Sequence, residues 1–191
     1  MGPLPNPAPN QRAGTRYVVG PRQCGRPVSQ HVRPQVSVRI RPAAQADAED
    51  VAKVLIESRR AFLPFAPSAH EPANVRRWVA TRLIPSGGVT VAEIEGRVAA
   101  VMATSHDGTA SWIDQLYVLP AHVGRGIGSC LLASAHADLR PPIRLYTFQA
   151  NSGARRFYER HGYEAIEFTD GSCNEERCPD VLYEFRPGPA A

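Results

Sequence analysis

Lysine is almost absent from this chain of 191 residues, which contains Lys53 as its single lysine. A phosphate-binding P-loop needs a lysine after its glycines, so the chain cannot carry that motif. Cysteine is also scarce, and its few copies are too scattered for a disulfide scaffold. We therefore expect a reducing, cytoplasmic location and, with no second cysteine pair or suitable histidine, no metal site. The cysteines are Cys24, Cys130, Cys173 and Cys178.

Long apolar runs are missing as well. No stretch approaches the roughly 18–20 residues that a membrane span needs, so no membrane association is expected. The N-terminus has no apolar segment of the kind found in secretory signals. With 43% hydrophobic and 21% charged residues, the chain is expected to fold as one soluble domain with a sizeable core.

Acidic residues are absent from residues 1–35, which hold five arginines and 7 of the 18 prolines. Residues 36–191 hold 17 basic and 18 acidic residues, so the formal charge of +4 comes from the N-terminal segment. We predict that residues 1–35 are a disordered basic tail, because they have too few apolar residues to offset the entropy of ordering. No nucleic-acid partner is expected, although a basic arm that touches an anionic surface is an alternative.

Hydrophobic periodicity predicts a regular arrangement of elements from residue 36 onward. Short links between successive strands favour antiparallel pairing. The predicted class is therefore α+β, in α/β/α layers, with a mixed, mostly antiparallel sheet of six to seven strands and about four helices. The expected strands are 36–41, 89–94, 97–103, 111–118, 143–148, 163–168 and 181–185, and the expected helices are 47–60, 71–84, 126–139 and 152–161.

A glycine-rich turn lies between the strand at 111–118 and the helix that follows. Gly124, Gly126 and Gly128 allow the backbone to approach a ligand and leave amide N–H groups free at the start of the helix. These donors and the helix dipole favour phosphate, although a tight turn for packing is the alternative. A Rossmann fingerprint is excluded, because the turn follows strands with antiparallel links rather than a parallel βαβ unit.

Two sequence blocks carry a resemblance to a known family. Residues 113–120 and 124–132 resemble the acetyl-CoA motif of the GNAT acetyltransferases. Residues 148–163 are similar to the family signature Asn-x-x-Ala-x-x-x-Tyr-x-x-x-Gly-Phe/Tyr. The resemblance covers about residues 36–187 and implies the GNAT fold and acetyl-CoA as co-substrate. It departs from the family pattern at Val123, where a glutamine or arginine is usual.

The resemblance also implies roles for individual residues. The strand end would present backbone groups to pantetheine and the thioester carbonyl, and the glycine turn would hold the pyrophosphate. Asn151 would bond to the cofactor or to a structural water, with a plain helix cap as the alternative. The implied contacts are Leu116, Tyr117 and Val118 from the strand, and Gly124, Arg125, Gly126, Ile127, Gly128 and Ser129 from the turn.

Tyr158 matches the position of the family's general acid. A phenol with an ordinary pKa near 10 can protonate the leaving thiolate. The alternative is an aromatic packed beside Phe157, although Phe157 suits that packing role better. With Asn151, Tyr158 is the predicted catalytic residue.

The family resemblance does not supply a general base. A position that often holds glutamate in the family is Tyr146 here, which leaves Asp114 as the candidate, either acting through water or simply a polar strand residue. The acidic loop 170–180, with His70, Glu71 and Asp107, could form an anionic rim for an ammonium group, or simply be a solvated loop. We interpret the histidines His31, His106, His122, His136 and His161 as surface or packing residues.

Together these features predict an acetyl-CoA-dependent N-acetyltransferase. The acceptor would be a primary amine on a small molecule or a peptide N-terminus, attacked directly in a ternary complex. The alternative function is a non-catalytic acyl-CoA-binding sensor module. A homodimer is possible.

Overall fold

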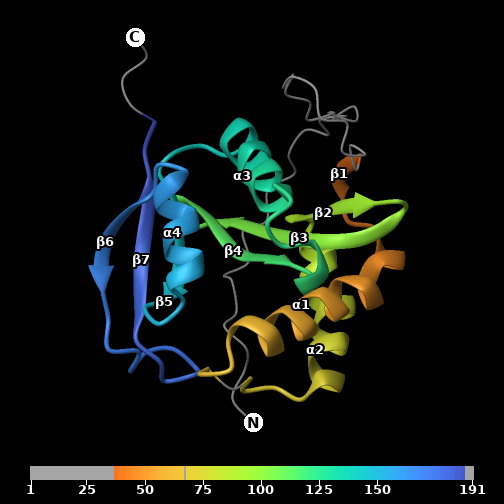
Figure 1. Cartoon of the computed structure of the whole chain (residues 1–191), viewed down its shortest axis with the longest axis horizontal. Coiled ribbons are helices and arrows are strands. Elements are labelled where there is room, and N and C mark those ends of the chain that lie inside the picture. The colour runs from red at the N-terminus through yellow and green to blue at the C-terminus, as the bar shows by residue number, and fades with distance from the viewer. Residues whose placement is uncertain (1–36, 67, 188–191) are drawn as a thin grey trace.

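The computed structural model describes residues 37–66 and 68–187, which form a seven-stranded sheet with helices packed on it (Figure 1). The order of the strands is β1-β2-β3-β4-β5-β7-β6, and only β4 and β5 pair in parallel. The predicted mixed, mostly antiparallel sheet is therefore confirmed. The strands are β1 (Val38–Pro42), β2 (Val89–Ile94), β3 (Arg97–His106), β4 (Ser111–Val118), β5 (Ile143–Phe148), β6 (Glu164–Phe168) and β7 (Asp180–Phe185).

The helices agree with the predicted ones in number and order. None of those in the described ranges is long and apolar enough to cross a membrane. The predicted tail, residues 1–35, lies outside the described residues, so its disorder stays a prediction. The helices are α1 (Ala48–Phe62), α2 (Pro72–Trp78), α3 (Ile127–Asp138) and α4 (Ser152–Arg160).

The second helix is shorter than predicted. Instead of running from 71 to 84, α2 ends at Trp78 and continues as a π-helical turn, Val79–Leu83, and a 3₁₀ turn, Ile84–Ser86. The N–H of Ile84 reaches back to the carbonyl of Val79. Pro85 has no N–H group to donate, so an α-helical ladder cannot continue through this position, and a 3₁₀ turn closes the segment.

Adjacent residues of the central strands belong to two separate hydrophobic cores, one on each face of the sheet. Val91 and Val101 pack with the α1 and α2 side, whereas Ala92 and Met102 pack with the α3 and α4 side. Such strands are apolar on both faces because successive side chains point in opposite directions. The sheet is thus covered by helices on both faces, as the predicted layers require.

The face of α1 that the sequence predicts to be buried is confirmed. Val51, Val54, Leu55 and Ser58 are at most 4% exposed. Ser58 is a polar member of this face, and its hydroxyl donates to the Val118 carbonyl at 2.9 Å. This bond satisfies a buried hydroxyl and ties α1 to the end of β4.

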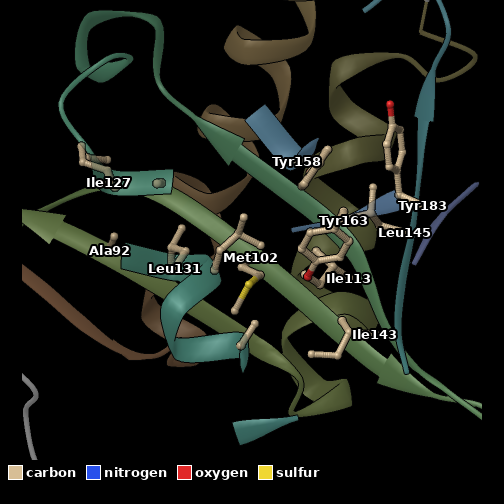
Figure 2. Close-up of a cluster of buried hydrophobic side chains, with 14 of the residues drawn as sticks. Ala92, Met102, Ile113, Ile127, Leu131, Ile143, Leu145, Tyr158, Tyr163 and Tyr183 are labelled. Carbon is tan, nitrogen blue, oxygen red and sulfur yellow. The ribbon is translucent and has the colours of Figure 1, made fainter. Parts of the chain in front are cut away.

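Tyrosines are prominent in the core beneath α3 and α4. Figure 2 shows Tyr158 and Tyr163 among the aliphatic side chains of the central strands, with Leu131 from α3 close by. The Tyr158 ring lies 5.6 Å from Tyr163 and 5.2 Å from Phe157, both edge-on. Edge-to-face pairs of this kind stabilise aromatic cores, so α4 is held firmly against the sheet.

The parallel strands β4 and β5 separate soon after they begin. They pair only at Ser111 with Ile143 and at Trp112 with Arg144, although β4 runs on to Val118 and β5 to Phe148. Beyond this point β4 continues to pair with β3, and β5 with β7, on their outer sides. The sheet therefore opens between the carboxyl ends of the two strands, as the family resemblance implies.

Candidate functional site

A cleft of about 840 Å³ lies where β4 and β5 diverge. Its walls come from the ends of both strands, the glycine turn before α3, one side of α4 and the end of α1. Segments that are far apart in the sequence thus meet at one opening of the sheet. A concave site with mostly apolar walls and a few polar groups is typical of a small-molecule site.

The glycine turn lies in this wall and ends at α3. Gly124 and Gly126 have φ values of +79° and +81°, a conformation that favours glycine. Gly126 is the N-cap of α3, and a glycine has no side chain to accept a hydrogen bond from the first turn. The first-turn N–H groups are therefore available to an anionic ligand, and the helix dipole favours the same charge.

Most of the residues predicted to hold the cofactor line this cleft, and Arg125 is the exception. Gly128 faces the Phe157 ring, and a Cβ at this glycine would lie 3.2 Å from the ring. A larger residue here would therefore require the ring to shift by a few tenths of an ångström. The predicted residues in the wall are Leu116, Tyr117, Val118, Gly124, Gly126, Ile127, Gly128, Ser129, Asn151 and Tyr158.

We interpreted His161 from the sequence as a surface or packing residue. In the structure it contacts Ser129, one of the residues in the cleft wall. His161 Nε2 lies 2.9 Å from Ser129 Oγ, and His161 Nδ1 lies 2.7 Å from the Phe157 carbonyl. The carbonyl can only accept, so Nδ1 donates to it, and in the tautomer that carries its proton on Nδ1 the ring accepts at Nε2 from the Ser129 hydroxyl. This contact links α4 to the first turn of α3, and no sequence pattern pointed to it.

His122 was also interpreted as a surface or packing residue, and the structure places it in the cleft wall. Its Nδ1 atom is buried and has no hydrogen-bond partner among the described residues. A buried polar atom of this kind is costly unless a ligand or water completes it. His122 is thus a candidate ligand contact beside the glycine turn.

Tyr158 is 7% exposed and lines the cleft from α4, so the same residue serves the core and the site. Burial, followed by the nearby Tyr117 and Tyr163, raises the pKa of its hydroxyl above the ordinary value. The phenol consequently stays protonated across the neutral range. That is the state in which a general acid must wait.

Asn151 is the N-cap of α4, and its side-chain oxygen accepts from the N–H of Ala154 at 3.1 Å. The helix-cap alternative is therefore observed. The side chain also lies in the cleft wall, so its amide nitrogen can donate to a ligand at the same time.

Asp114 occupies a bulge in β4. Gln115 pairs with Ala103 and Ile113 pairs with Thr104, which leaves Asp114 as the extra residue of the strand. Among the residues that line the cleft, Asp114 is the single acidic one. Desolvation raises the pKa of Asp114, and a hydrogen bond with Ser105 opposes that shift.

The acidic loop between β6 and β7 does not present all of its carboxylates to a substrate. Glu176 pairs with Arg59 of α1 at 2.7 Å, and Glu175 lies 2.9 Å from His70. In Figure 1 this blue loop meets the yellow segment that follows α1. Two acids of the expected anionic rim are thus already partnered, and they join the loop to α1 and the segment after it.

Comparisons with known proteins agree with this architecture. A family model described as an acetyltransferase (GNAT) domain matches residues 85–165. An uncharacterized N-acetyltransferase of Archaeoglobus fulgidus is 30% identical over 133 residues, which are 63% of this chain and 89% of that protein. The match extends across most of the relative, so it covers the common domain.

Solved structures share the fold. The PaiA N-acetyltransferase of Thermoplasma acidophilum, in complex with coenzyme A, gives a TM-score of 0.63 at 21% identity and covers 79% of this chain and 99% of its own. The ribosomal-protein-S18-alanine N-acetyltransferase of Escherichia coli gives 0.61 at 14% identity and covers 81% and 96%. Taken with the sequence matches, these findings show that the chain belongs to the GNAT family of acetyltransferases and is an acyltransferase enzyme.

Proposed function

We propose that this enzyme transfers an acetyl group from acetyl-CoA to a primary amine on a small molecule or a peptide N-terminus. The observation that carries the proposal is the uncapped N-terminus of α3, which opens into the cleft that also contains Asp114. The helix end suits the anionic phosphates, and the carboxylate suits a cationic amine. Complementarity to both substrates at once favours direct attack in a ternary complex.

The residues at the α3 end fit a pyrophosphate group. Backbone N–H groups at Ile127, Gly128 and Ser129 would donate to its oxygens. Arg160 is the single arginine among the residues that line the cleft, and its neighbour His161 contacts Ser129. We infer that Arg160 supplies positive charge at this end, where Val123 offers no polar group.

The middle of the cleft fits the pantetheine arm. Among the described residues, the β5-facing edge of Leu116–Val118 has no strand partner, so its backbone groups would bond to the amides of the arm. Asn151 would contribute its side-chain nitrogen from the opposite wall. The parts of β4 and β5 that do not pair with each other thus gain their hydrogen bonds from the ligand.

Two side chains would handle the protons. Acetyl-CoA supplies an acetyl thioester, in which the carbon–sulfur bond breaks as the carbon–nitrogen bond forms. Tyr158 would donate its phenolic proton to the departing sulfur, because burial keeps this hydroxyl protonated. Asp114 would accept the proton that the amine loses, directly or through water.

Binding and turnover can be tested separately. Coenzyme A would be titrated into the full chain by calorimetry. Release of the thiol of acetyl-CoA and of longer acyl-CoAs would then be followed with a panel of primary amines, against a control without amine. We expect coenzyme A to bind and thiol release to depend on the amine. Binding without release on any amine would favour the acyl-CoA sensor, and failure to bind coenzyme A would overturn the proposal.

A further inference from the structure

Exposed apolar side chains are concentrated in the cleft. Of the large hydrophobic residues that the described part of the chain exposes, Phe62, Phe65, Tyr146 and Val123 all line it. The two others, Ile166 and Phe168, lie on the edge strand β6. Exposed aromatic groups are costly in water, and their grouping in one concavity indicates an apolar ligand.

Aromatic neighbours hold two of these rings in place. Tyr146 stacks on Trp112 with ring centroids 5.9 Å apart and an interplanar angle of 12°. Phe65 meets Phe148 edge-on at 5.9 Å. Each ring is therefore oriented before a ligand arrives, which lowers the entropy that binding would lose.

Asp114 lies on the same face of the sheet as these rings. Asp114 from β4 and Tyr146 and Phe148 from β5 all line the cleft, just beyond the point where Trp112 pairs with Arg144. The intervening residues Ile113 and Leu145 are buried on the opposite face. Phe148 follows Tyr146 by two positions and shares its face. One carboxylate thus stands beside a group of aromatic rings.

We propose that the acceptor is an arylalkylamine, a primary amine with an aromatic body and no carboxylate. Its ammonium group pairs with Asp114, and its ring lies against Phe62, Phe65 and Tyr146. This inference rests on the proposed acetyl transfer and specifies its acceptor.

The charges in the part of the cleft that contains Asp114 explain why the proposed acceptor has no carboxylate. Arg59, which lies 3.5 Å from the Tyr117 hydroxyl, is paired with Glu176 at 2.7 Å. Arg160, the arginine that lines the cleft, lies on α4 beside the contact between His161 and Ser129. A free amino acid would therefore place its carboxylate near Asp114 without a cation to balance it.

The first test compares acceptors on the unmodified enzyme. Initial rates of thiol release from acetyl-CoA would be measured with 2-phenylethylamine, ethanolamine and phenylalanine. We expect kcat/KM for 2-phenylethylamine to exceed that for each of the others by roughly tenfold or more. A smaller advantage over ethanolamine or phenylalanine, or none, would overturn the inference.

The second test removes one ring at a time. Phe65→Ala and Tyr146→Ala should each lower the ratio of kcat/KM for 2-phenylethylamine to that for ethanolamine by roughly tenfold. Phe168→Ala is the matched control, since this ring is 58% exposed and lies outside the cleft. Melting temperatures and coenzyme A affinity would show that each variant is folded, and an unchanged ratio in both folded cleft variants would contradict the inference.

The outcomes separate this inference from the proposed function. Turnover of ethanolamine that equals or exceeds turnover of 2-phenylethylamine would leave amine acetylation standing and remove the arylalkylamine assignment. No thiol release with any amine, despite tight coenzyme A binding, would remove acetyl transfer to amines as well.

Discussion

Tyr158 is a residue with two environments, because its ring packs in the core while its side chain borders the cleft. We predict that Tyr158→Phe keeps the packing, lowers kcat by at least roughly tenfold and leaves coenzyme A affinity unchanged. Steady-state kinetics and calorimetry would measure the two effects.

Tyr163→Phe is the matched control for that prediction. Tyr163 is also a buried tyrosine with a raised pKa, but its hydroxyl contacts His136 at 3.2 Å and it does not line the cleft. Its loss should change kcat by no more than about twofold. Normal turnover in Tyr158→Phe would remove this phenol from the mechanism.

Asp114 should set an acidic limit to activity. Desolvation raises its pKa, so the carboxylate becomes protonated at a higher pH than an ordinary aspartate, for which the value is about 3.9. A base must be ionised, and kcat/KM should therefore fall as the pH is lowered through this raised pKa. In Asp114→Asn that limb should disappear, and kcat/KM near neutral pH should fall by at least roughly tenfold.

The pH profile of Asp138→Asn provides the comparison. Asp138 is an exposed carboxylate at the end of α3, away from the cleft. This variant should keep the acidic limb of the unmodified enzyme. If Asp114→Asn also keeps it, the limb belongs to another group and Asp114 is not the base.

At the scale of elements, the turn before α3 depends on glycine for its backbone conformation. Gly126→Ala would place an L side chain at a φ of +81°, which costs about 1–2 kcal/mol of folding stability. The substitution should also change the conformation of the turn and so shift the first N–H groups of α3. We therefore predict weaker coenzyme A binding. Chemical denaturation and calorimetry would measure the two effects.

Gly96→Ala separates strain from binding. Gly96 has a φ of +75° in the hairpin between β2 and β3, and a Cβ would meet nothing within 4 Å at either glycine. The two variants should lose similar stability, but Gly96→Ala should bind coenzyme A normally. Equal affinities in the two variants would contradict a phosphate role for the turn.

At the scale of the whole molecule, the residues that line the cleft all lie between Ser58 and Arg160. Residues 1–35 carry the surplus of positive charge, whereas residues 36–191 have 17 basic and 18 acidic residues. We predict that a chain that begins at residue 36 keeps its coenzyme A affinity and melts within roughly 2 °C of the full chain.

Calorimetry and thermal denaturation of the two chains would test this prediction. If the shorter chain is folded but binds coenzyme A much more weakly than the full chain at low salt, the result would instead favour a basic arm that touches an anionic surface. The homodimer stays a separate prediction. A dimer could cover the exposed edge strand β6, which would otherwise leave unpaired backbone groups at the edge of the sheet.

Much of the fold was predictable because its signals are local. Strands β2, β4 and β5 have the bounds that alternation and turn residues indicate, and the four α-helices follow from helical spacing and caps. The end of α2 was missed, since the π-helical turn after Trp78 depends on how the chain reaches Pro85 within a packed core. Local propensity does not contain that constraint.

The sequence by itself determined the family, the glycine turn and the position of Tyr158, because motifs of adjacent residues carry them. Only the tertiary structure decided the bulge that turns Asp114 into the cleft, the contact between His161 and Ser129, and the meeting of Phe65 with Phe148. These features join segments that are distant in the chain. Their geometry depends on how β4 and β5 diverge and on which side chains fill the space between them, and no periodicity along a single segment records that.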